Sequence, residues 1–115
     1  MAPTRPHLLP NDGEAYEMRG LAHYANNEFD KAIADLSEAI RLVPDDARIF
    51  INRSICYGAL REYGNSIADC TEAIRLRPDY AEAYHQRGLT YKADGKLVEA
   101  DADFAKAREL GHEDE

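Results

Sequence analysis

Apolar residues recur every three or four positions along most of the 115-residue chain, and they do not alternate with period two over any useful length. This spacing is typical of amphipathic helices, which bury one face. Pro44 and Pro78 interrupt the pattern, as expected where a helix has ended. Asn11 with Glu14, and Asp79 with Glu82, have the spacing of a capping box at the start of the next helix. The sequence predicts six helices and no sheet, with helices over about residues 13–26, 29–43, 47–60, 63–76, 81–93 and 97–110.

One block of sequence occurs twice and then a third time in weaker form. Residues 33–45 are IADLSEAIRLVPD, residues 67–79 are IADCTEAIRLRPD, and residues 101–110 are DADFAKAREL, so each block begins 34 residues after the last. A fixed period of this length is typical of stacked two-helix units, each of which buries its apolar face against a neighbour. We therefore divide the chain into an N-terminal extension, 1–12, and one domain, 13–114, of three units, 13–46, 47–80 and 81–114. Residues 111–115 are expected to form a disordered acidic tail.

The three units resemble the tetratricopeptide repeat (TPR), whose pattern places aromatic and small residues at fixed positions and ends on proline. The matching residues are Tyr16, Gly20, Ala32, Ala39 and Pro44 in the first unit, Phe50, Ser54, Tyr57, Ser66, Ala73 and Pro78 in the second, and Tyr84, Gly88, Tyr91, Ala100, Phe104 and Ala107 in the third. His112 stands where the third proline is usual. The resemblance implies an all-α fold, an α-solenoid of three helix-turn-helix hairpins in a right-handed superhelix.

The chain departs from the family pattern by carrying arginine where leucine is usual, and an aspartate follows each arginine by sixteen residues. The pairs are Arg19 with Asp35, Arg53 with Asp69, and Arg87 with Asp103. The two positions lie about equally far from the hairpin turn, so we expect each pair to form a bidentate ion pair within its unit. The alternative is a ladder of arginines that binds an anionic ligand.

The second helix of the last unit differs from its two counterparts. Isoleucines occupy two equivalent positions in the first two units, Ile33 with Ile40 and Ile67 with Ile74, whereas the third unit has Asp101 and Arg108 there. We expect the isoleucines to pack on the unit that follows. The two charges would make the outer face of the last helix wettable, as a terminal repeat requires.

Composition narrows the function further. Acidic residues outnumber basic ones 22 to 14, giving a formal net charge of −8, which disfavours nucleic acid and anionic membrane as partners. The start of the chain lacks the apolar segment of a signal peptide, so we expect a cytoplasmic protein. Cys56 and Cys70 are too few for a disulfide scaffold, and the four histidines lack metal-ligand spacing. We find no catalytic motif and expect no enzyme, no cofactor and no metal site.

The resemblance also implies a binding surface, because in this family the first helix of each unit lines a concave groove. Carried over position by position, the groove residues are Glu17, Met18, Leu21, Tyr24, Arg48, Ile51, Asn52, Ile55, His85, Gln86, Leu89 and Lys92, with Glu14, Gly58 and Glu82 at its edges. One subfamily grips the acidic tails of heat-shock chaperones with lysine, asparagine and arginine at five of these positions. Here only Asn52 matches, and Glu17 and Glu82 would repel a carboxylate. We therefore do not expect a chaperone-tail binder.

The apolar groove residues suggest the kind of partner. Leu21, Ile55 and Leu89 should form a strip edged by acids, which suits a peptide or protein with apolar anchors and a few basic flanking residues. The predicted function is thus a non-enzymatic adaptor or scaffold that binds a protein partner in its groove. Three alternatives stay open: Ile51 and Ile55 pack between neighbouring helices, the strip is covered by the HLLP segment at residues 7–10, or the strip closes a homo-oligomer. In the last case the chain is a structural subunit of a larger assembly.

Overall fold

The computed structural model describes residues 12–113, and these residues form six helices. The helices are α1 (Gly13–Ala25), α2 (Phe29–Leu42), α3 (Ala47–Ala59), α4 (Tyr63–Leu76), α5 (Ala81–Ala93) and α6 (Leu97–Glu109). Each begins where the sequence predicts and ends within one residue of the predicted position, and the described part of the chain contains no strand. The prediction of an all-α fold is confirmed. The predicted extension, including the HLLP segment, lies outside the described residues except for Asp12.

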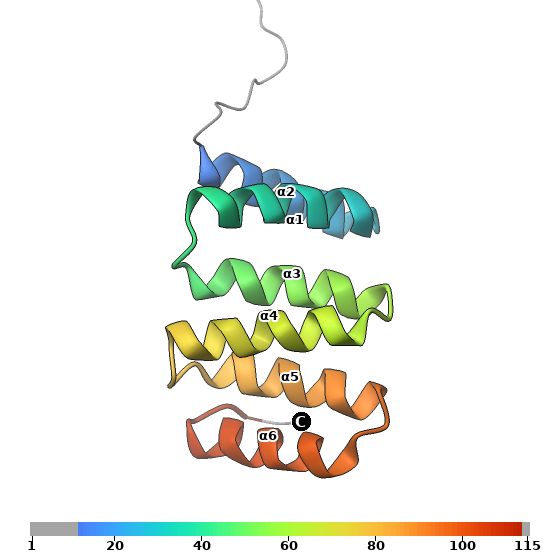
Figure 1. Ribbon diagram of the computed structural model, residues 1–115, viewed down its shortest axis with the longest axis vertical. Helices are drawn as coiled ribbons and strands as arrows, with labels where there is room; N and C mark the ends of the chain where they lie inside the picture. The colour runs from blue at the N-terminus through green and yellow to red at the C-terminus, as the bar shows by residue number, and fades with distance from the viewer. Residues whose placement is uncertain (1–11, 114–115) are drawn as a thin grey trace, which may run out of the picture.

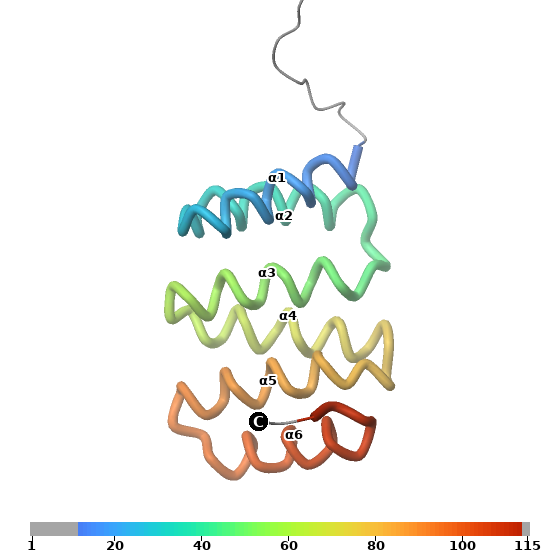
Figure 2. The backbone as a smooth tube through the Cα atoms, turned by 180° about the vertical axis from the view of Figure 1, so that it is seen from behind, coloured from blue at the N-terminus to red at the C-terminus, as the bar shows by residue number. Residues whose placement is uncertain are grey.

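The helices pair into three antiparallel hairpins, α1/α2, α3/α4 and α5/α6, which stack along the long axis of a molecule of 56 × 25 × 23 Å (Figure 1). Viewed from behind, α1, α3 and α5 lie toward the reader and form one layer (Figure 2). Each of these first helices contacts the next, and α2 and α4 pack on α3 and α5, the first helices of the following hairpins. The molecule is therefore an α-solenoid with the first helices along one side.

The three hairpin turns share one backbone device. Asn27, Arg61 and Gly95 all have positive φ, at 60°, 62° and 80°. The residue after each donates its N–H to a carbonyl five residues earlier, at 2.8 to 2.9 Å, which closes the end of the first helix. This left-handed position favours glycine, so Asn27 and Arg61 are held there by the turn itself.

Close packing within the hairpins depends on small residues opposite large ones. A Cβ on Gly20 would lie 2.9 Å from Leu36 Cγ, and one on Gly88 would lie 2.7 Å from Phe104 Cε1. In the middle hairpin the glycine is replaced by Ser54, and the residue that faces it is the smaller Cys70, with both side chains fully buried. The summed volume is thus kept roughly constant, as a close-packed core requires.

The N-caps of α1 and α5 differ from prediction: α1 is capped by Asp12 rather than Asn11, and α5 has no side-chain cap. Asp12 and Asp46 accept hydrogen bonds from the backbone of Ala15 and Arg48 and so cap α1 and α3. The equivalent residue before α5 is Tyr80, which makes no side-chain cap. Asp79 is therefore not the cap that its spacing from Glu82 predicts. Tyr80 is instead buried beneath the Arg77 guanidinium, whose carbon lies 4.0 Å from the ring centroid.

Candidate interaction groove

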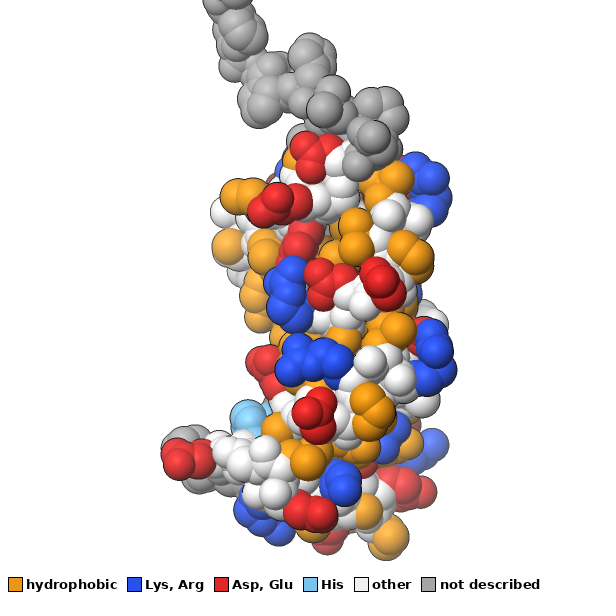
Figure 3. Space-filling model, turned by 90° about the vertical axis from the view of Figure 1, so that its left-hand side faces the viewer, with side chains coloured by type: hydrophobic (Ala, Val, Ile, Leu, Met, Phe, Trp, Pro, Cys, Tyr) orange, Lys and Arg blue, Asp and Glu red, His pale blue; other side chains and the backbone are white. Residues whose placement is uncertain are grey.

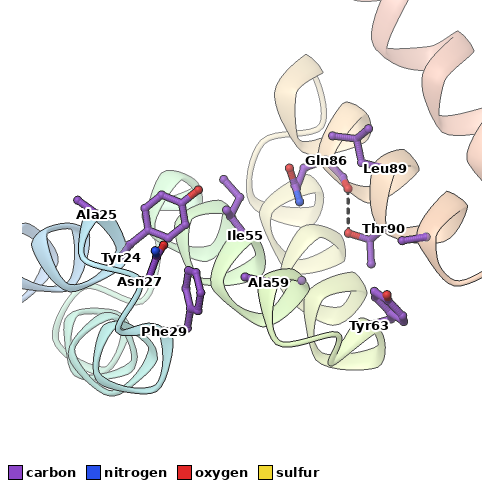
Figure 4. Close-up of a pocket in the computed structure, with 12 residues that line it drawn as sticks. Tyr24, Ala25, Asn27, Phe29, Ile55, Ala59, Tyr63, Gln86, Leu89 and Thr90 are labelled. Carbon is purple, nitrogen blue, oxygen red and sulfur yellow. Dashed lines mark hydrogen bonds between the residues drawn. The ribbon is translucent and has the colours of Figure 1, made fainter.

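The layer of first helices carries an open apolar pocket of about 430 Å³ that spans all three hairpins (Figure 4). Its lining consists of Tyr24, Ala25, Asn27, Phe29, Ile55, Gly58, Ala59, Tyr63, Gln86, Leu89, Thr90 and Ala93. No lining residue is charged. Such a pocket, apolar with a few polar groups, is of a size and character that suits a large side chain of a ligand.

Aromatic rings form the two ends of this pocket. Figure 4 shows Tyr24 and Phe29 together at one end, Ile55 and Ala59 in the middle, and Tyr63 with Leu89 at the other. The Tyr24 and Phe29 ring centroids are 5.8 Å apart and the rings are tilted by 58°, a separation at which aromatic rings attract each other. Leu89 is 44% exposed and Tyr24 is also exposed, so both can contact a ligand.

Only part of the predicted groove lines the pocket. Tyr24, Ile55, Gln86 and Leu89 do so, whereas Leu21 lies outside the lining. A second set of predicted groove residues is exposed elsewhere on the first helices: Met18, Leu21, Arg48 and Lys92. Ile51 is only 2% exposed and belongs to the core, so its assignment to the groove is wrong and the alternative of packing between helices holds for it. Ile55 is half-buried, and it both packs on the core and lines the pocket.

Two lining aromatics were not among the predicted site residues. Phe29 and Tyr63 begin α2 and α4, so a search limited to first helices misses them. A signal is present in the sequence, because large apolar residues recur 34 apart at Phe29, Tyr63 and Leu97, directly after each turn. They belong to the pocket because the turn brings the start of each second helix back beside the end of the first.

The other end of the groove holds an ion-pair network centred on Glu17. This carboxylate is 7% exposed, and it accepts from Arg48 Nη1 at 3.0 Å and from Asn52 Nδ2 at 3.4 Å. Arg48 also donates to Asp46 at 3.0 Å, and its neighbour Glu17 raises the pKa of the guanidinium. Glu17 and Asn52 are therefore engaged with each other across two hairpins. A smaller pocket of about 260 Å³ adjoins them, with Glu14 and Val43 in its lining.

Charges of both signs surround this network. On the side where α1, α3 and α5 begin, acidic and basic side chains are interleaved with apolar ones (Figure 3). The exposed charges of the groove are the acidic Glu14 and Glu82 at its edge and the basic Arg48 and Lys92. Tyr80 hydroxyl donates to Glu82 at 3.4 Å, a weak contact that leaves the carboxylate exposed.

His85 contacts the end of the chain rather than open groove. Its ring centroid lies 4.1 Å from that of His112 and 5.5 Å from that of Phe104. The chain turns back after α6 because Gly111 has a φ of +102° and the His112 N–H donates to Ala107 O at 2.9 Å. The expectation of disorder over 111–115 therefore does not fit Gly111 and His112, while residues 114 and 115 lie outside the described part.

The three arginines each engage the aspartate sixteen residues later. Nε and Nη2 of each arginine donate to the two oxygens of Asp35, Asp69 or Asp103 at 2.7 to 2.9 Å, and all three aspartates are buried. Each arginine binds both oxygens of its aspartate through two nitrogens, so the geometry is bidentate. The guanidinium forks are thus occupied by the protein's own carboxylates, which argues against an anion-binding ladder.

Arg53 and Arg87 also join neighbouring hairpins, which the sequence did not predict. Arg53 Nη1 donates to Ser37 Oγ at 2.9 Å, and Arg87 Nη1 donates to Thr71 Oγ1 at 3.2 Å. The hydroxyls lie on the preceding second helix. Ala105, which has no hydroxyl, stands at the same position of α6.

A family model described as tetratricopeptide repeat matches residues 5–47 and 17–81, and a second one with the same description matches residues 70–102. The chain belongs to the tetratricopeptide repeat family. This family membership and the similar solved structures support a protein–protein interaction module.

Several solved TPR domains are similar to this chain over most of its length. The first TPR domain of Spaghetti (RPAP3), bound to the HSP90 peptide SRMEEVD, is 26% identical with a TM-score of 0.84 over 91% of this chain and 83% of its own. The TPR domain of Arabidopsis OM64 is 29% identical, with a TM-score of 0.84 over 86% and 82%. The TPR2B domain of yeast Sti1 in complex with pHsp70 is 26% identical, with a TM-score of 0.83 over 85% and 78%. Comparison with curated protein sequences gives no match.

Residues 12–113 of this TPR chain give no support for a metal site, a membrane-spanning helix or a reactive cysteine. Among residues 12–113 no three histidine, cysteine, aspartate or glutamate side chains are placed to hold a metal ion. None of the helices in that range is both long and apolar enough to cross a membrane. Burial raises the pKa of Cys56 to about 11 and that of Cys70 to about 12, so neither thiol is an available nucleophile near neutral pH.

Proposed function

We propose that this protein is a non-enzymatic adaptor that binds a peptide or helix of a protein partner in the groove, with a large apolar side chain of the partner in the 430 Å³ pocket. The observation that carries the proposal is the pocket itself, because exposed apolar side chains from three hairpins converge there with no charged residue among them. An exposed, concave apolar surface of this kind is typical of a contact site.

The charges favour basic residues beside the apolar anchor. The chain has a net charge of −8, and Glu14 and Glu82 are exposed at the groove edge. Lysine or arginine in the partner would pair with these carboxylates and speed the encounter. A partner with a large apolar residue and basic neighbours is therefore the best match.

The same charges argue against the acidic chaperone tails that some similar structures bind. The peptide bound by the RPAP3 domain ends in EEVD, which carries three acidic side chains. At the clamp positions this chain has Glu17, Leu21, Asn52, Glu82 and Gln86, and Asn52 donates to Glu17. No cation is available among these five residues to hold a carboxylate, so we infer that acidic tails are not the ligands.

Peptide selection on the full chain tests this function. We expect selected peptides to carry one or two large apolar residues beside lysine or arginine, and we expect SRMEEVD not to bind. Leu89→Glu should lower the affinity of a selected peptide about tenfold or more, because it places a charge in the apolar pocket. Ala102→Glu, which adds the same charge at an exposed position of the same hairpin, should leave affinity unchanged.

Selection of acidic peptides, or of peptides whose affinity is unaffected by Leu89→Glu, would show that the groove is not the binding site. Leu89 is preferred to Ile55 for this substitution because Ile55 also packs on the core, where a charge would destabilise the fold. Fluorescence anisotropy with labelled peptides gives the affinities directly.

A structural subunit is the second candidate, and one observation favours it. Leu97 and Val98 are both large, apolar and exposed at the start of α6, at the end of the stack. Sedimentation velocity at micromolar concentration separates the two candidates. A monomer supports the adaptor, whereas a defined oligomer that dissociates on Val98→Asp supports the structural subunit.

A further inference from the structure

Helices α3 and α5 both contact the preceding hairpin through three equivalent positions. On α3 these are Ile49, Arg53 and Cys56, and Ile49 and Cys56 are buried in a cluster with Leu36 of α2. On α5 they are Ala83, Arg87 and Thr90, with both Ala83 and Thr90 buried. The three positions are spaced by four and three residues, so they lie on one face of the helix.

The helix that covers this face has a matching pattern. From α2 it presents Ile33, Ser37 and Ile40, and from α4 it presents Ile67, Thr71 and Ile74. Ile33 and Ile40 pack against the cluster that contains Ile49, and Ile74 packs against the cluster that contains Ala83. The central hydroxyl accepts from Nη1 of the facing arginine in both interfaces. Each interface therefore combines isoleucine contacts, two at the first interface and at least that of Ile74 at the second, with one arginine–hydroxyl hydrogen bond.

Helix α1 has the equivalent face, but among the described residues no preceding hairpin covers it. Its three positions are Ala15, Arg19 and Ala22, which match the small–arginine–small set of α5. Ala22 is exposed, and the Arg19 side chain is 53% exposed where those of Arg53 and Arg87 are 20% exposed. Nε and Nη2 of Arg19 are engaged by Asp35 as in the other pairs, while no described residue accepts from its Nη1.

We propose that this outer face of α1, at the top of the stack in Figure 1, docks an amphipathic helix of a protein partner. The partner helix would present an aliphatic residue, a serine or threonine four positions later, and a second aliphatic residue three positions after that. This is the pattern that covers the two equivalent faces inside the molecule, so the proposal extends an interface that the chain already forms twice.

A second copy of this chain is not the occupant. The face that it would offer in a head-to-tail stack is that of α6, where the three positions are Asp101, Ala105 and Arg108. Stacking would bury the Asp101 carboxylate against the alanine face of α1 and would give the Arg19 Nη1 no hydroxyl, because Ala105 stands at the central position. Burying a carboxylate against apolar side chains is strongly unfavourable, so the α6 face does not fit this surface.

The chain supplies its own matched probes. One is a labelled peptide with the sequence of residues 29–42, held helical by a staple, which carries the Ile33–Ser37–Ile40 face. The other has the sequence of residues 97–109 and carries the Asp101–Ala105–Arg108 face. We expect the first to bind the full-length protein by fluorescence anisotropy and the second not to bind. Replacing the serine of the first peptide by alanine should weaken binding about two- to tenfold, the effect of one hydrogen bond.

Three protein variants locate the site. Ala22→Glu should weaken binding of the first peptide at least tenfold, whereas Leu89→Glu in the groove and Ala102→Glu on α6 should not change it. Circular dichroism checks that all three variants remain folded. The proposal is overturned if wild type does not bind the first peptide, if both peptides bind equally, or if Leu89→Glu rather than Ala22→Glu abolishes binding.

Discussion

The three Arg–Asp pairs differ in how far the arginine is buried, so they test how burial determines the cost of removing its carboxylate partner. Asp69→Ala leaves Arg53 without the two hydrogen bonds of 2.7 and 2.8 Å that it donates to the carboxylate. With only 20% of its side chain exposed, Arg53 cannot regain full hydration. Removing one partner of a buried pair typically costs about 3–5 kcal/mol. Arg53 keeps its hydrogen bond to Ser37, so we expect a loss of about 2–4 kcal/mol.

The pair at the start of the stack should behave differently. Arg19 is 53% exposed and can turn into water once Asp35 is removed, so Asp35→Ala should cost only about 1–2 kcal/mol. Asp103→Ala should resemble Asp69→Ala, because Arg87 is as well covered as Arg53. Asp101→Ala is the matched control, since it makes the same chemical change at an exposed position and should be almost neutral.

Urea unfolding followed by circular dichroism at 222 nm measures these differences. The double variant Arg53→Met/Asp69→Leu should be more stable than Asp69→Ala, because it removes both charges and fills the space with apolar atoms. Equal costs at Asp35 and Asp69 would contradict the argument from burial. A double variant as unstable as Asp69→Ala would show that the stranded guanidinium is not the source of the loss.

Three further predictions concern glycines and a thiol. Gly95→Ala should cost about 1 kcal/mol of stability in thermal melts, because the φ of +80° disfavours alanine even though an added Cβ meets no atom within 4 Å. Gly64 is equally open but lies inside α4, so Gly64→Ala should stabilise the protein by about 0.5–1 kcal/mol. Gly88→Ala should destabilise by about 1 kcal/mol, since the new Cβ would meet Phe104 at 2.7 Å, and adding Phe104→Leu should restore part of the loss in the same melts. Because burial raises the pKa of Cys70 to about 12, the thiolate is absent at pH 8 and its labelling should be roughly 10³-fold slower than in urea, as measured by mass spectrometry. Rapid labelling of folded protein, a stabilised Gly95→Ala, or a neutral Gly88→Ala would each contradict the corresponding argument.

The helices and the Arg–Asp pairs were predictable because both depend on short, repeated spacings. A period of 34 residues aligns three copies, so an ambiguous end in one copy is settled by the other two. Arg53 and Asp69 are sixteen residues apart on the two helices of one hairpin, and the turn between them is short enough to determine that they face each other.

The groove was harder to predict because side-chain depth depends on contacts between units. Glu17 and Ile51 occupy the same position of successive first helices, which faces the groove by periodicity but is covered by the neighbouring helix. The partner of Glu17 is Arg48, 31 residues away in the next unit, and this pairing is not repeated because the equivalent positions 34 residues later hold Ile51 and Glu82. A pairing that is not repeated gives no periodic signal.

The two ends of the stack differ in the polarity of their outer faces, and this difference affects which end can bind another helix. At α6 the outward positions that would contact a following hairpin are charged, at Asp101 and Arg108, so water is the better neighbour there. On α1, the positions equivalent to those through which α3 and α5 contact the preceding hairpin are Ala15 and Ala22. Neither residue is polar. On α5 a set equally small, Ala83 and Thr90, is fully covered by α4, so small size at these positions is what an approaching helix requires rather than an adaptation to solvent. At the α6 end, a further helix would have to displace water from charged side chains, which opposes stacking. No such cost arises at the α1 end, so α1 is the end through which a helix can extend the solenoid.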